Sequence, residues 1–349
     1  MSDDARRTLR LGTTDADLQR AAELLRGGGL VALPTETVYG LAVRADDADA
    51  VASLFAAKDR PADNPLIVHV ADVDDVLRVA REVTPLARVL LERLAPGPVT
   101  VVLPARDDLP RAVTGGLDTV AVRIPDHPVM REVLARCAVP LAAPSANRSG
   151  RPSPTRAEHV VADLEGRIAA IVDAGPTRLG VESTVLDARG TTWRVLREGG
   201  LGREAIAAAL AGTAYAASDT VGGAGDPEGM TGSPGTRHRH YAPSLPVHLA
   251  RPGEGVALAA RLAAEVPGAR VGLVAPGAAA APTPPEVHVL AAPADAAALA
   301  AELFALLRTA EECGVTGLVV EAVEERGIGR AVMDRLRRAM SASGGTDTT

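Results

Sequence analysis

Several short segments of this sequence combine proline or glycine with hydroxyl, amide and charged side chains, as substrate-binding loops do. The segment PTETVYG, from Pro34 to Gly40, follows a short apolar run and carries two threonines, a carboxylate and a phenol. Taken alone, it is explained equally well as a turn in which Thr35 or Thr37 caps a helix. Its chemistry becomes informative only beside similar segments elsewhere in the chain.

The segment KDRPADNPL, from Lys58 to Leu66, places two cations and an amide in a loop stiffened by two prolines. Recognition of phosphate or carboxylate requires such rigidity, whereas a solvated charged loop does not. Of the 37 lysine and arginine residues, Lys58 is the only lysine. This indicates a position that needs a compact ammonium rather than a planar guanidinium. Chance survival of one lysine in an arginine-biased sequence is the alternative.

Two apolar runs that predict β-strands contain polar residues. His69 lies in LIVHV, and a histidine in such a strand is more often a buried core residue than a ligand. Thr119 and Arg123 are four residues apart in TVAVRIP, so their side chains emerge on one face of the strand. An arginine there would bind a carboxylate if it faces a cleft, or form a salt bridge if it faces the surface.

The loop with the most small hydroxyl residues is PSANRSGRPSPT, from Pro144 to Thr155. Serine, threonine and glycine let backbone amides and hydroxyls approach a polyanion closely. The segments ESTV after Val181 and REGG after Leu196 repeat this composition. Together with Lys58, the loops predict a site for a triphosphate and a carboxylate. Motifs for a Walker phosphate loop, a serine nucleophile elbow or a zinc-binding helix are absent from the sequence.

Apolar periodicity predicts two α/β domains. Strands and helices over residues 12–211 predict a twisted, mostly mixed sheet with helices. Residues 212–245 are rich in glycine and predict a linker, although its RHRHYAP end is too dense in cations and rings for a simple spacer. Residues 246–341 alternate strands and helices as a smaller Rossmann-like domain does. The last residues, SASGGTDTT, predict a disordered tail.

Composition excludes several classes of protein. The 349 residues are 47% hydrophobic, which excludes a disordered chain, and the formal net charge of −7 argues against a surface that coats nucleic acid. Cys137 and Cys313 cannot form a disulfide framework, so a reducing compartment is expected. We find no secretory signal and no uncharged apolar run long enough for a membrane span. A cytoplasmic location is therefore expected.

The dense segments, taken in order, resemble one enzyme family. PTETVYGL, KDRPADNPLIVH, APGPVT, VRIPDHP, PSANRSGRPSPT, GVESTV and LREGG resemble the motifs of YrdC-type L-threonylcarbamoyl-AMP synthases. SPGTRHRHYAP resembles the linker of the long, two-domain members, and GIGRAVMDRLRRA the end of their C-terminal domain. The resemblance covers about residues 15–340. Thr236 and His238 replace a methionine and a tyrosine of the usual linker motif, and Ala95 replaces a tryptophan.

The resemblance implies a YrdC-like catalytic domain and a nucleotidyltransferase activity. Such enzymes join L-threonine, bicarbonate and ATP into threonylcarbamoyl-AMP and release pyrophosphate. This is the first step toward N6-threonylcarbamoyladenosine at position 37 of tRNA (t6A37). The resemblance also implies Mg²⁺ bound with ATP, no dedicated protein metal site, and transfer of the product to the tRNA threonylcarbamoyl transferase machinery. Strong direct binding of nucleic acid is not expected.

The family's functional residues carry over to matching positions here. Those implied to bind threonine or its carbamate are Thr37, His69, Arg123, Ala143 through its backbone, and Ser183. Those implied to bind ATP are Lys58, Arg60, Asn64, Thr119, Ser145, Ser153 and Arg197, with Lys58 neutralising the phosphates. Arg123 is the expected partner of the amino-acid carboxylate. His240 and Tyr241 are expected to close the site as part of a lid over 231–243, with the second domain as its anchor.

Two other functions compete with this interpretation. A non-catalytic RNA-binding module could use the same basic cleft, but the net charge and the scarcity of aromatic residues for base stacking argue against it. An enzyme of the same fold could transfer a carbamoyl group to a partner protein. Acylphosphatase-like and zinc-finger segments would then be expected, and the sequence contains neither.

Overall fold

The computed structural model describes residues 7–216, 241, 243–277 and 283–349, and it divides into two units. Among these residues, the first unit comprises 7–149, 153–178 and 182–216. The second unit comprises the remainder, including the short segments Gly150–Pro152 and Leu179–Val181. Most of the predicted linker lies outside the described residues.

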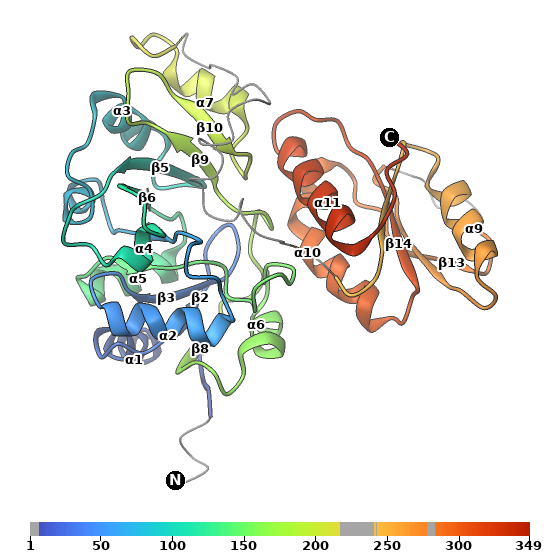
Figure 1. The fold of residues 1–349 in the computed structure, drawn as a ribbon, viewed down its shortest axis with the longest axis horizontal. Helices are drawn as coiled ribbons and strands as arrows, with labels where there is room; N and C mark the ends of the chain where they lie inside the picture. Colours follow the sequence, from blue (N-terminus) through green and yellow to red (C-terminus); the bar gives the residue numbers. More distant parts are fainter. Residues whose placement is uncertain (1–6, 217–240, 242, 278–282) are drawn as a thin grey trace. The chain divides into compact units, whose positions relative to one another are not determined.

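The first unit contains a ten-stranded mixed sheet (Figure 1). Its strands lie in the order β1 (Leu9–Leu11), β8 (Ala170–Val172), β2 (Val31–Leu33), β3 (Gly40–Arg44), β7 (Leu141–Ala142), β4 (Ile67–His69), β6 (Thr119–Arg123), β5 (Val99–Pro104), β9 (Thr184–Asp187) and β10 (Arg194–Arg197). The pairs β1–β8, β8–β2, β4–β6 and β5–β9 are parallel, and the other neighbours are antiparallel. The predicted mixed sheet is confirmed.

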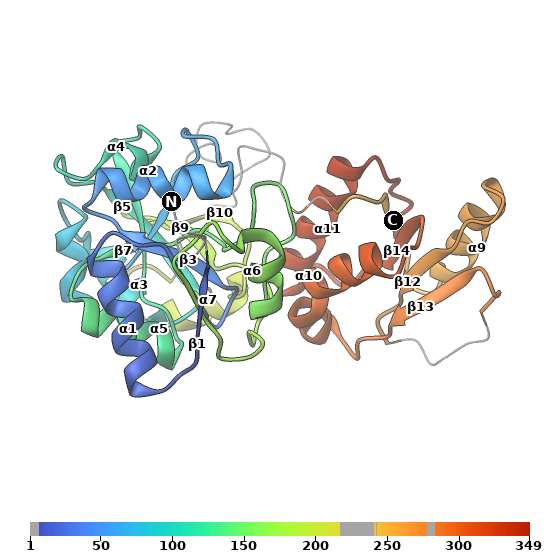
Figure 2. The same ribbon diagram turned by 90° about the horizontal axis from the view of Figure 1, so that it is seen from below.

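Helices cover this sheet on both faces. They are α1 (Asp15–Arg26), α2 (Ala48–Lys58), α3 (Pro85–Leu94), α4 (Arg111–Thr114), α5 (Pro128–Cys137), α6 (Ala157–Leu164) and α7 (Arg203–Leu210), with a 3-10 turn at Asp74–Arg78. Local sequence fixes their starts: the hydroxyls of Thr14 and Thr84 accept backbone N–H bonds at α1 and α3. Helices α1 and α5 pack side by side (Figure 2) and share one apolar cluster.

Alternation along the central strands separates the core from a second, smaller apolar surface. One face buries Val68, Val101, Val120, Val122 and Leu186 in the main core cluster. The residues between them point the other way, because side chains alternate along a strand. They form a small separate cluster: Ile67, Val102, Ala121, Val185 and Leu196. This second face has an apolar floor and also carries His69, Thr119 and Arg123, which alternate with the core residues along β4 and β6.

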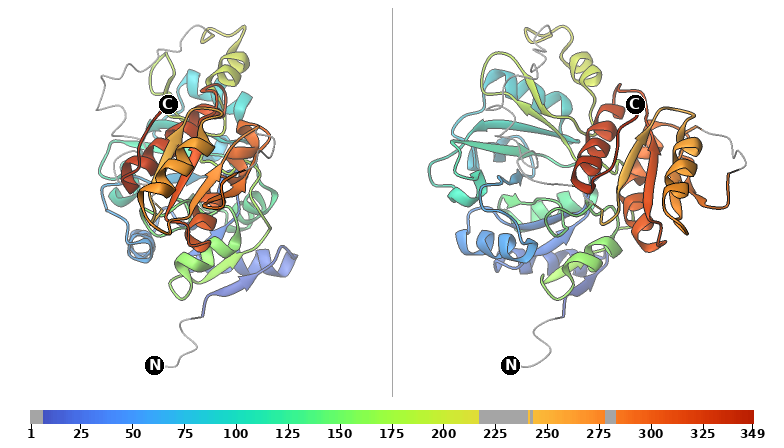
Figure 3. Two further views of the ribbon diagram at one scale, coloured as in Figure 1. Left: turned by 90° about the vertical axis from the view of Figure 1, so that its right-hand side faces the viewer. Right: turned by 45° about the vertical axis from the view of Figure 1, so that its right-hand side comes forward.

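The second unit is a parallel four-stranded sheet between helices (Figure 3). Its strand order is β11 (Val247–Ala250), β14 (Gly317–Glu321), β12 (Val271–Val274) and β13 (Val287–Ala291). Helix α9 (Gly255–Glu265) covers one face, and α10 (Ala296–Glu312) with α11 (Gly329–Ser343) covers the other. The predicted Rossmann-like arrangement of strands and crossover helices is confirmed.

The prediction of a disordered tail is wrong. Helix α11 continues to Ser343, and the following residues return along the free edge of β11. Backbone bonds join Leu249 N to Thr346 O at 2.9 Å and Thr348 N to Leu249 O at 3.1 Å. At Gly345 a Cβ atom would lie 1.6 Å from Val247 O, so the return requires glycine. An unpaired strand edge recruits this polar segment through its backbone, which composition does not reveal.

The sheet of the first unit also begins earlier than residue 12, the predicted start of the domain. Strand β1 pairs with β8, and Thr8 Oγ1 donates to Ile168 O at 2.9 Å. The three residues LRL are too short to indicate a strand by themselves. Their partner lies about 160 residues further along the chain, so only the folded structure reveals the pairing.

The core of the first unit can be tested through its single tryptophan. Trp193 and Leu41 are both fully buried in the main cluster. We expect Leu41→Ala to lower the free energy of unfolding of this unit by about 2–5 kcal/mol, through lost burial and a residual cavity. Denaturation followed by Trp193 fluorescence measures this. Leu77→Ala, at a half-exposed position, is the control, and equal effects of the two substitutions would contradict the assignment of the core.

Candidate active site

Strands β4 and β6 place His69 and Arg123 side by side. The two strands are parallel, and their register pairs His69 with Arg123 and Ile67 with Ala121. Directly after β7, which borders β4 on its other side, Ala143 N donates to Ile67 O at 2.9 Å. Because alternate residues share a face, Arg123 and His69 project from the apolar floor described above. His69, Arg123 and Ala143, all implied to bind threonine, therefore lie at or directly after the ends of three adjacent strands.

Strands β5, β9 and β10 add a second group to the same face. Thr100 Oγ1 and Ser183 Oγ are hydrogen-bonded at 2.7 Å. Arg197 Nη2 donates to Ser183 O at 2.9 Å and reaches Ser183 Oγ at 3.3 Å. A Cβ atom at Gly199 would lie 2.2 Å from the carbonyl carbon of Ser183, so this close approach requires glycine. The structure thus brings together Ser183, implied to bind threonine, and Arg197, implied to bind ATP.

The segment between β2 and β3 folds around the hydroxyl of Thr35. Thr35 Oγ1 donates to Val38 O at 2.7 Å and accepts from the backbone N–H groups of Thr37 and Val38. It is also bonded to Thr37 Oγ1 at 2.8 Å. This compact turn is a local hydroxyl–backbone motif, and no helix follows it. Thr35 fixes the turn, and Glu36 and Thr37 are both buried within it.

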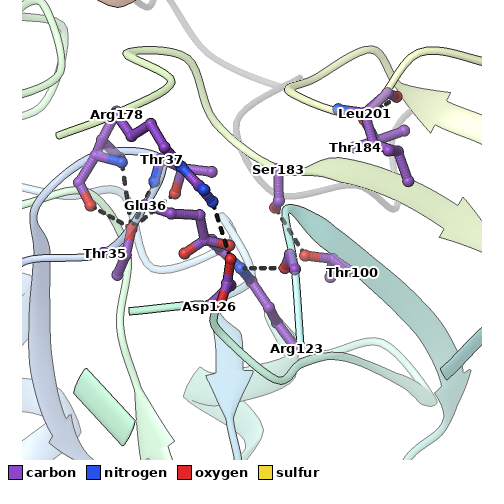
Figure 4. A network of polar contacts seen from close by, with 12 residues as sticks. Thr35, Glu36, Thr37, Thr100, Arg123, Asp126, Arg178, Ser183, Thr184 and Leu201 are labelled. Carbon is purple, nitrogen blue, oxygen red and sulfur yellow. Dashed lines mark hydrogen bonds and ion pairs between the residues drawn. The ribbon is translucent and has the colours of Figure 1, made fainter. Parts of the chain in front are cut away.

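Glu36 points from this turn to Arg123 (Figure 4). Its Oε1 lies 2.7 Å from Arg123 Nη2, and both side chains are almost completely buried, with 1% and 5% exposure. Beside them, an exposed ion pair joins Asp126 to Arg178 at 2.9 Å. Arg123 therefore has a buried carboxylate partner rather than a place in a surface salt bridge. The surface salt bridge is thereby excluded, and binding of a substrate carboxylate by Arg123 stays a prediction.

His69 is buried without a hydrogen-bond partner on either ring nitrogen among the described residues. Burial, together with the positive charge of Arg123, lowers the pKa of His69 from 6.5 to about 3. The imidazole is therefore neutral at physiological pH. A neutral ring with two unused nitrogens can both donate and accept a hydrogen bond, which suits a group that touches a polar substrate.

Lys58 ends helix α2 and lies completely inside the protein. Its Nζ donates to the backbone carbonyls of Ser145 and Asn147, each at 2.5 Å. Burial holds the pKa of Lys58 well below its usual value, and the nearby Arg60 acts in the same direction. In the folded chain, then, the ammonium secures the backbone of the loop that begins at Pro144. Its proposed contact with phosphate remains a prediction.

The other residues implied to bind ATP lie in three places. Arg60 donates to Asn64 O at 3.3 Å and to Pro65 O at 2.9 Å, so it fixes the proline-stiffened loop that follows α2. Ser153 Oγ donates to Glu182 Oε1 at 2.6 Å, which links the hydroxyl-rich loop to the segment preceding Ser183. Thr119 begins β6 on the face that carries Arg123.

Of the two lid residues, His240 lies outside the described residues, as do Thr236, His238 and most of 231–243. Tyr241 belongs to the second unit and is 4% exposed. Its ring stacks on Phe304 at a centroid distance of 5.2 Å, and the Arg335 guanidinium lies 5.4 Å from its centroid. Helices α10 and α11 thus anchor the end of the linker. Closure of the site by the lid stays a prediction.

The site contains two side chains that the sequence did not predict to bind substrate. Glu36 is the only carboxylate in PTETVYG, and Thr100 follows the PGPV turn. Glu36 lies between two threonines after a buried strand. This position indicates a polar turn, but it does not indicate that the carboxylate pairs with Arg123. Thr100 is revealed only by the pairing of β5 with β9, which brings it to Ser183.

Two features are absent from the described residues. In this part of the chain, no group of three or more His, Cys, Asp or Glu side chains comes together as a metal site would require. None of its helices is long and apolar enough to cross a membrane.

Comparison with known proteins covers both units. A family model described as telomere recombination matches residues 23–199, and one described as the C-terminal domain of threonylcarbamoyl-AMP synthase matches residues 202–341. The threonylcarbamoyl-AMP synthase of Bacillus subtilis is 41% identical over 96% of this chain and 95% of its own length. That of Pyrococcus abyssi is 44% identical over 91% of this chain and 92% of its own length.

A solved structure extends the similarity to the fold. The crystal structure of Pyrococcus abyssi Sua5 complexed with L-threonine superimposes with a TM-score of 0.87 at 39% sequence identity. The match covers 98% of this chain and the whole of the other. Agreement in sequence, in both family models and in the fold shows that the chain belongs to the threonylcarbamoyl-AMP synthases, in their two-domain form.

Proposed function

We propose that the polar face of the first sheet binds L-threonine, bicarbonate and ATP and releases threonylcarbamoyl-AMP and pyrophosphate. The amine of threonine and bicarbonate give a carbamate and water. A carbamate oxygen then attacks the α-phosphorus of ATP, and pyrophosphate leaves. This chemistry needs no protein nucleophile; it needs reactants held in position and developing charge neutralised. The buried face that carries Arg123, His69 and Ser183 supports the proposal most directly, because its cations and unused polar atoms suit anionic, hydrogen-bonding reactants.

In this proposal, Arg123 binds the carboxylate of threonine through its planar guanidinium. His69, Thr37 and Ser183 offer hydrogen bonds to the remaining polar groups, and the backbone of Ala143 completes the threonine site. All five residues are buried. Exclusion of water strengthens each polar contact and protects an acyl-adenylate, which water would hydrolyse.

ATP is assigned to the loops beside this face. The residues proposed for it are Lys58, Arg60, Asn64, Thr119, Ser145, Ser153 and Arg197. Lys58 holds the loop carrying Ser145, so its charge lies where that loop would meet phosphate. Mg²⁺ would be held mainly by the triphosphate, since the described residues offer no protein-only cage. When bound, the ion would neutralise phosphate charge.

Two further proposals concern closure of the site and the fate of the product. We propose that residues 231–243 close over the site and that the second unit anchors them. Its packing around Tyr241 supports the anchoring role. The product would then pass to the machinery that transfers threonylcarbamoyl to tRNA, a cytoplasmic process compatible with two free cysteines.

The function is tested by incubating the purified chain with ATP, L-threonine and bicarbonate and assaying pyrophosphate. We expect release only when all three substrates are present, because the carbamate must form before it attacks ATP. The adenylate product is identified in parallel by mass spectrometry. Pyrophosphate release that is independent of threonine would contradict the proposed reaction.

The role of Arg123 is tested by varying each substrate separately. We expect Arg123→Gln to raise the KM for threonine by about 10- to 100-fold and to change the KM for ATP much less, because the lost contact is to the amino acid. Arg106→Gln, which removes an exposed arginine paired with Asp108, is the matched control. Similar effects on the two substrates would count against the assignment.

The neutrality of His69 predicts a pH dependence of stability. Below pH 6.5 the unfolded chain binds a proton on this histidine that the folded chain, with a pKa of about 3, does not bind. Acidification therefore favours unfolding, and stability is regained as the pH rises. From pH 7 to pH 5 we expect His69 to account for a loss of about 2 kcal/mol in the free energy of unfolding.

This loss is measured by denaturation followed by Trp193 fluorescence at both pH values. The His69→Gln variant should lose about 2 kcal/mol less than the parent chain on the same acidification. His288→Gln, at an exposed position of the second unit, should leave the dependence unchanged. An unaltered dependence in His69→Gln would show that this residue does not titrate as its burial requires.

A further inference from the structure

The contact between Glu36 and Arg123 is close but poorly aligned. Glu36 Oε1 and Arg123 Nη2 lie 2.7 Å apart, yet neither Arg123 Nη2 nor either oxygen of Glu36 makes a hydrogen bond of acceptable geometry. A buried carboxylate normally has several hydrogen bonds, since it gives up water to enter the protein. Glu36 therefore has capacity to accept donors that the described residues do not supply.

The unused groups around Glu36 are clustered. Both nitrogens of His69, which is the strand neighbour of Arg123, lack partners among the described residues, and so does Nδ1 of His127. The negative charge of Glu36 acts on His127, although burial, the larger effect, lowers the pKa of that ring. All these side chains belong to the first unit. His69 is paired with Arg123 in the strand register, and the charge of Glu36 acts on His127, so these unused donors and acceptors lie near the ion pair.

The charges at this position suit a zwitterion. Glu36 contributes one negative charge, Arg123 one positive charge, and His69 is neutral. If the carboxylate of threonine binds Arg123 while Glu36 keeps its present partner, the ammonium of threonine enters a buried site without a counter-ion, which is costly. If Glu36 instead receives the ammonium, the four charges alternate in sign and each has a partner.

We propose that Glu36 binds the α-amino group of L-threonine, exchanging its contact with Arg123 for one with the substrate. The inference rests on the proposed role of Arg123 as the carboxylate partner. Before threonine binds, Glu36 neutralises the buried guanidinium. Afterwards, its oxygens accept hydrogen bonds from the N–H groups of the ammonium and then of the carbamate nitrogen. Glu36 is thus a specificity-determining residue that selects α-amino acids over other small carboxylates.

The exchange has a consequence that a purely structural ion pair would not have. A carboxylate ligand without an amine must compete with Glu36 for Arg123, and it offers Glu36 no ammonium group in exchange. (R)-3-Hydroxybutanoate is such a ligand, because it retains the carboxylate and hydroxyl of L-threonine and lacks only the amine. Replacing Glu36 with glutamine removes the competitor for Arg123 and also removes the partner of the ammonium. The two ligands should therefore respond in opposite directions.

The experiment measures binding of both ligands by isothermal titration calorimetry to the full chain. We expect the parent chain to bind L-threonine far more tightly than (R)-3-hydroxybutanoate. In Glu36→Gln, affinity for threonine should fall by about 10- to 100-fold, as expected for loss of a charge-assisted contact. Affinity for (R)-3-hydroxybutanoate should rise severalfold. Unchanged threonine affinity, or equal weakening of both ligands, would overturn the proposal.

Two further variants keep the test decisive. Glu132→Gln removes an exposed glutamate that pairs with Arg136 at 2.8 Å, and it should change neither affinity. If Glu36→Gln does not fold, as judged by Trp193 fluorescence, Glu36→Asp replaces it. The shorter carboxylate should weaken threonine binding without any gain for (R)-3-hydroxybutanoate, because the negative charge remains. Full threonine affinity in Glu36→Asp, or a gain for the amine-free ligand, would overturn the proposal.

Failure of this inference is distinguishable from failure of the proposed function. If the parent chain binds no threonine, or if Arg123→Gln binds it normally, the proposed function of the site is wrong and the proposal about Glu36 falls with it. If the parent chain binds threonine through Arg123 and Glu36→Gln binds it equally well, only the role of Glu36 is wrong.

Discussion

Burial of positive charge is the constraint on which this site depends. Arg123, Lys58 and Arg197 are all almost fully inside the protein before any substrate is present. Each is held by a protein group: Arg123 by a carboxylate, Lys58 by two backbone carbonyls and Arg197 by the carbonyl of Ser183. A buried cation without such a partner would destabilise the fold by several kcal/mol. The positions of the loops around the site follow from the need to supply these partners.

The same strands build the core and the site. Val68 and Val122 enter the main core, while their neighbours His69 and Arg123 emerge on the opposite face. A shift of one residue in register would exchange these roles and bury two polar side chains among valines. The register of β4 against β6 is therefore essential both to stability and to recognition. This coupling explains how a mixed sheet holds widely separated segments of the sequence in one site.

The sequence indicated the composition of the site better than its contacts. Periodicity located most strands and helices, and the order of the motifs indicated the family. Arg123 was expected to bind a substrate carboxylate. In the free chain its partner is Glu36, which the turn around Thr35 brings to it. Likewise, Lys58 was expected to bind phosphate, and the structure shows it hydrogen-bonded to the loop that begins at Pro144. The hydrogen-bond and ion-pair partners of these side chains depend on long-range backbone geometry, which no local sequence pattern predicts.

The pairing of the final residues with β11 has a consequence for how the chain folds as it is synthesised. Strand β11 leaves the ribosome about a hundred residues before Thr346 and Thr348, which complete its free edge. The parallel strands of this unit also pair across long loops, and closing each loop has an entropic cost. Until residue 348 has emerged, the nascent second unit therefore exposes an unpaired edge to other nascent chains.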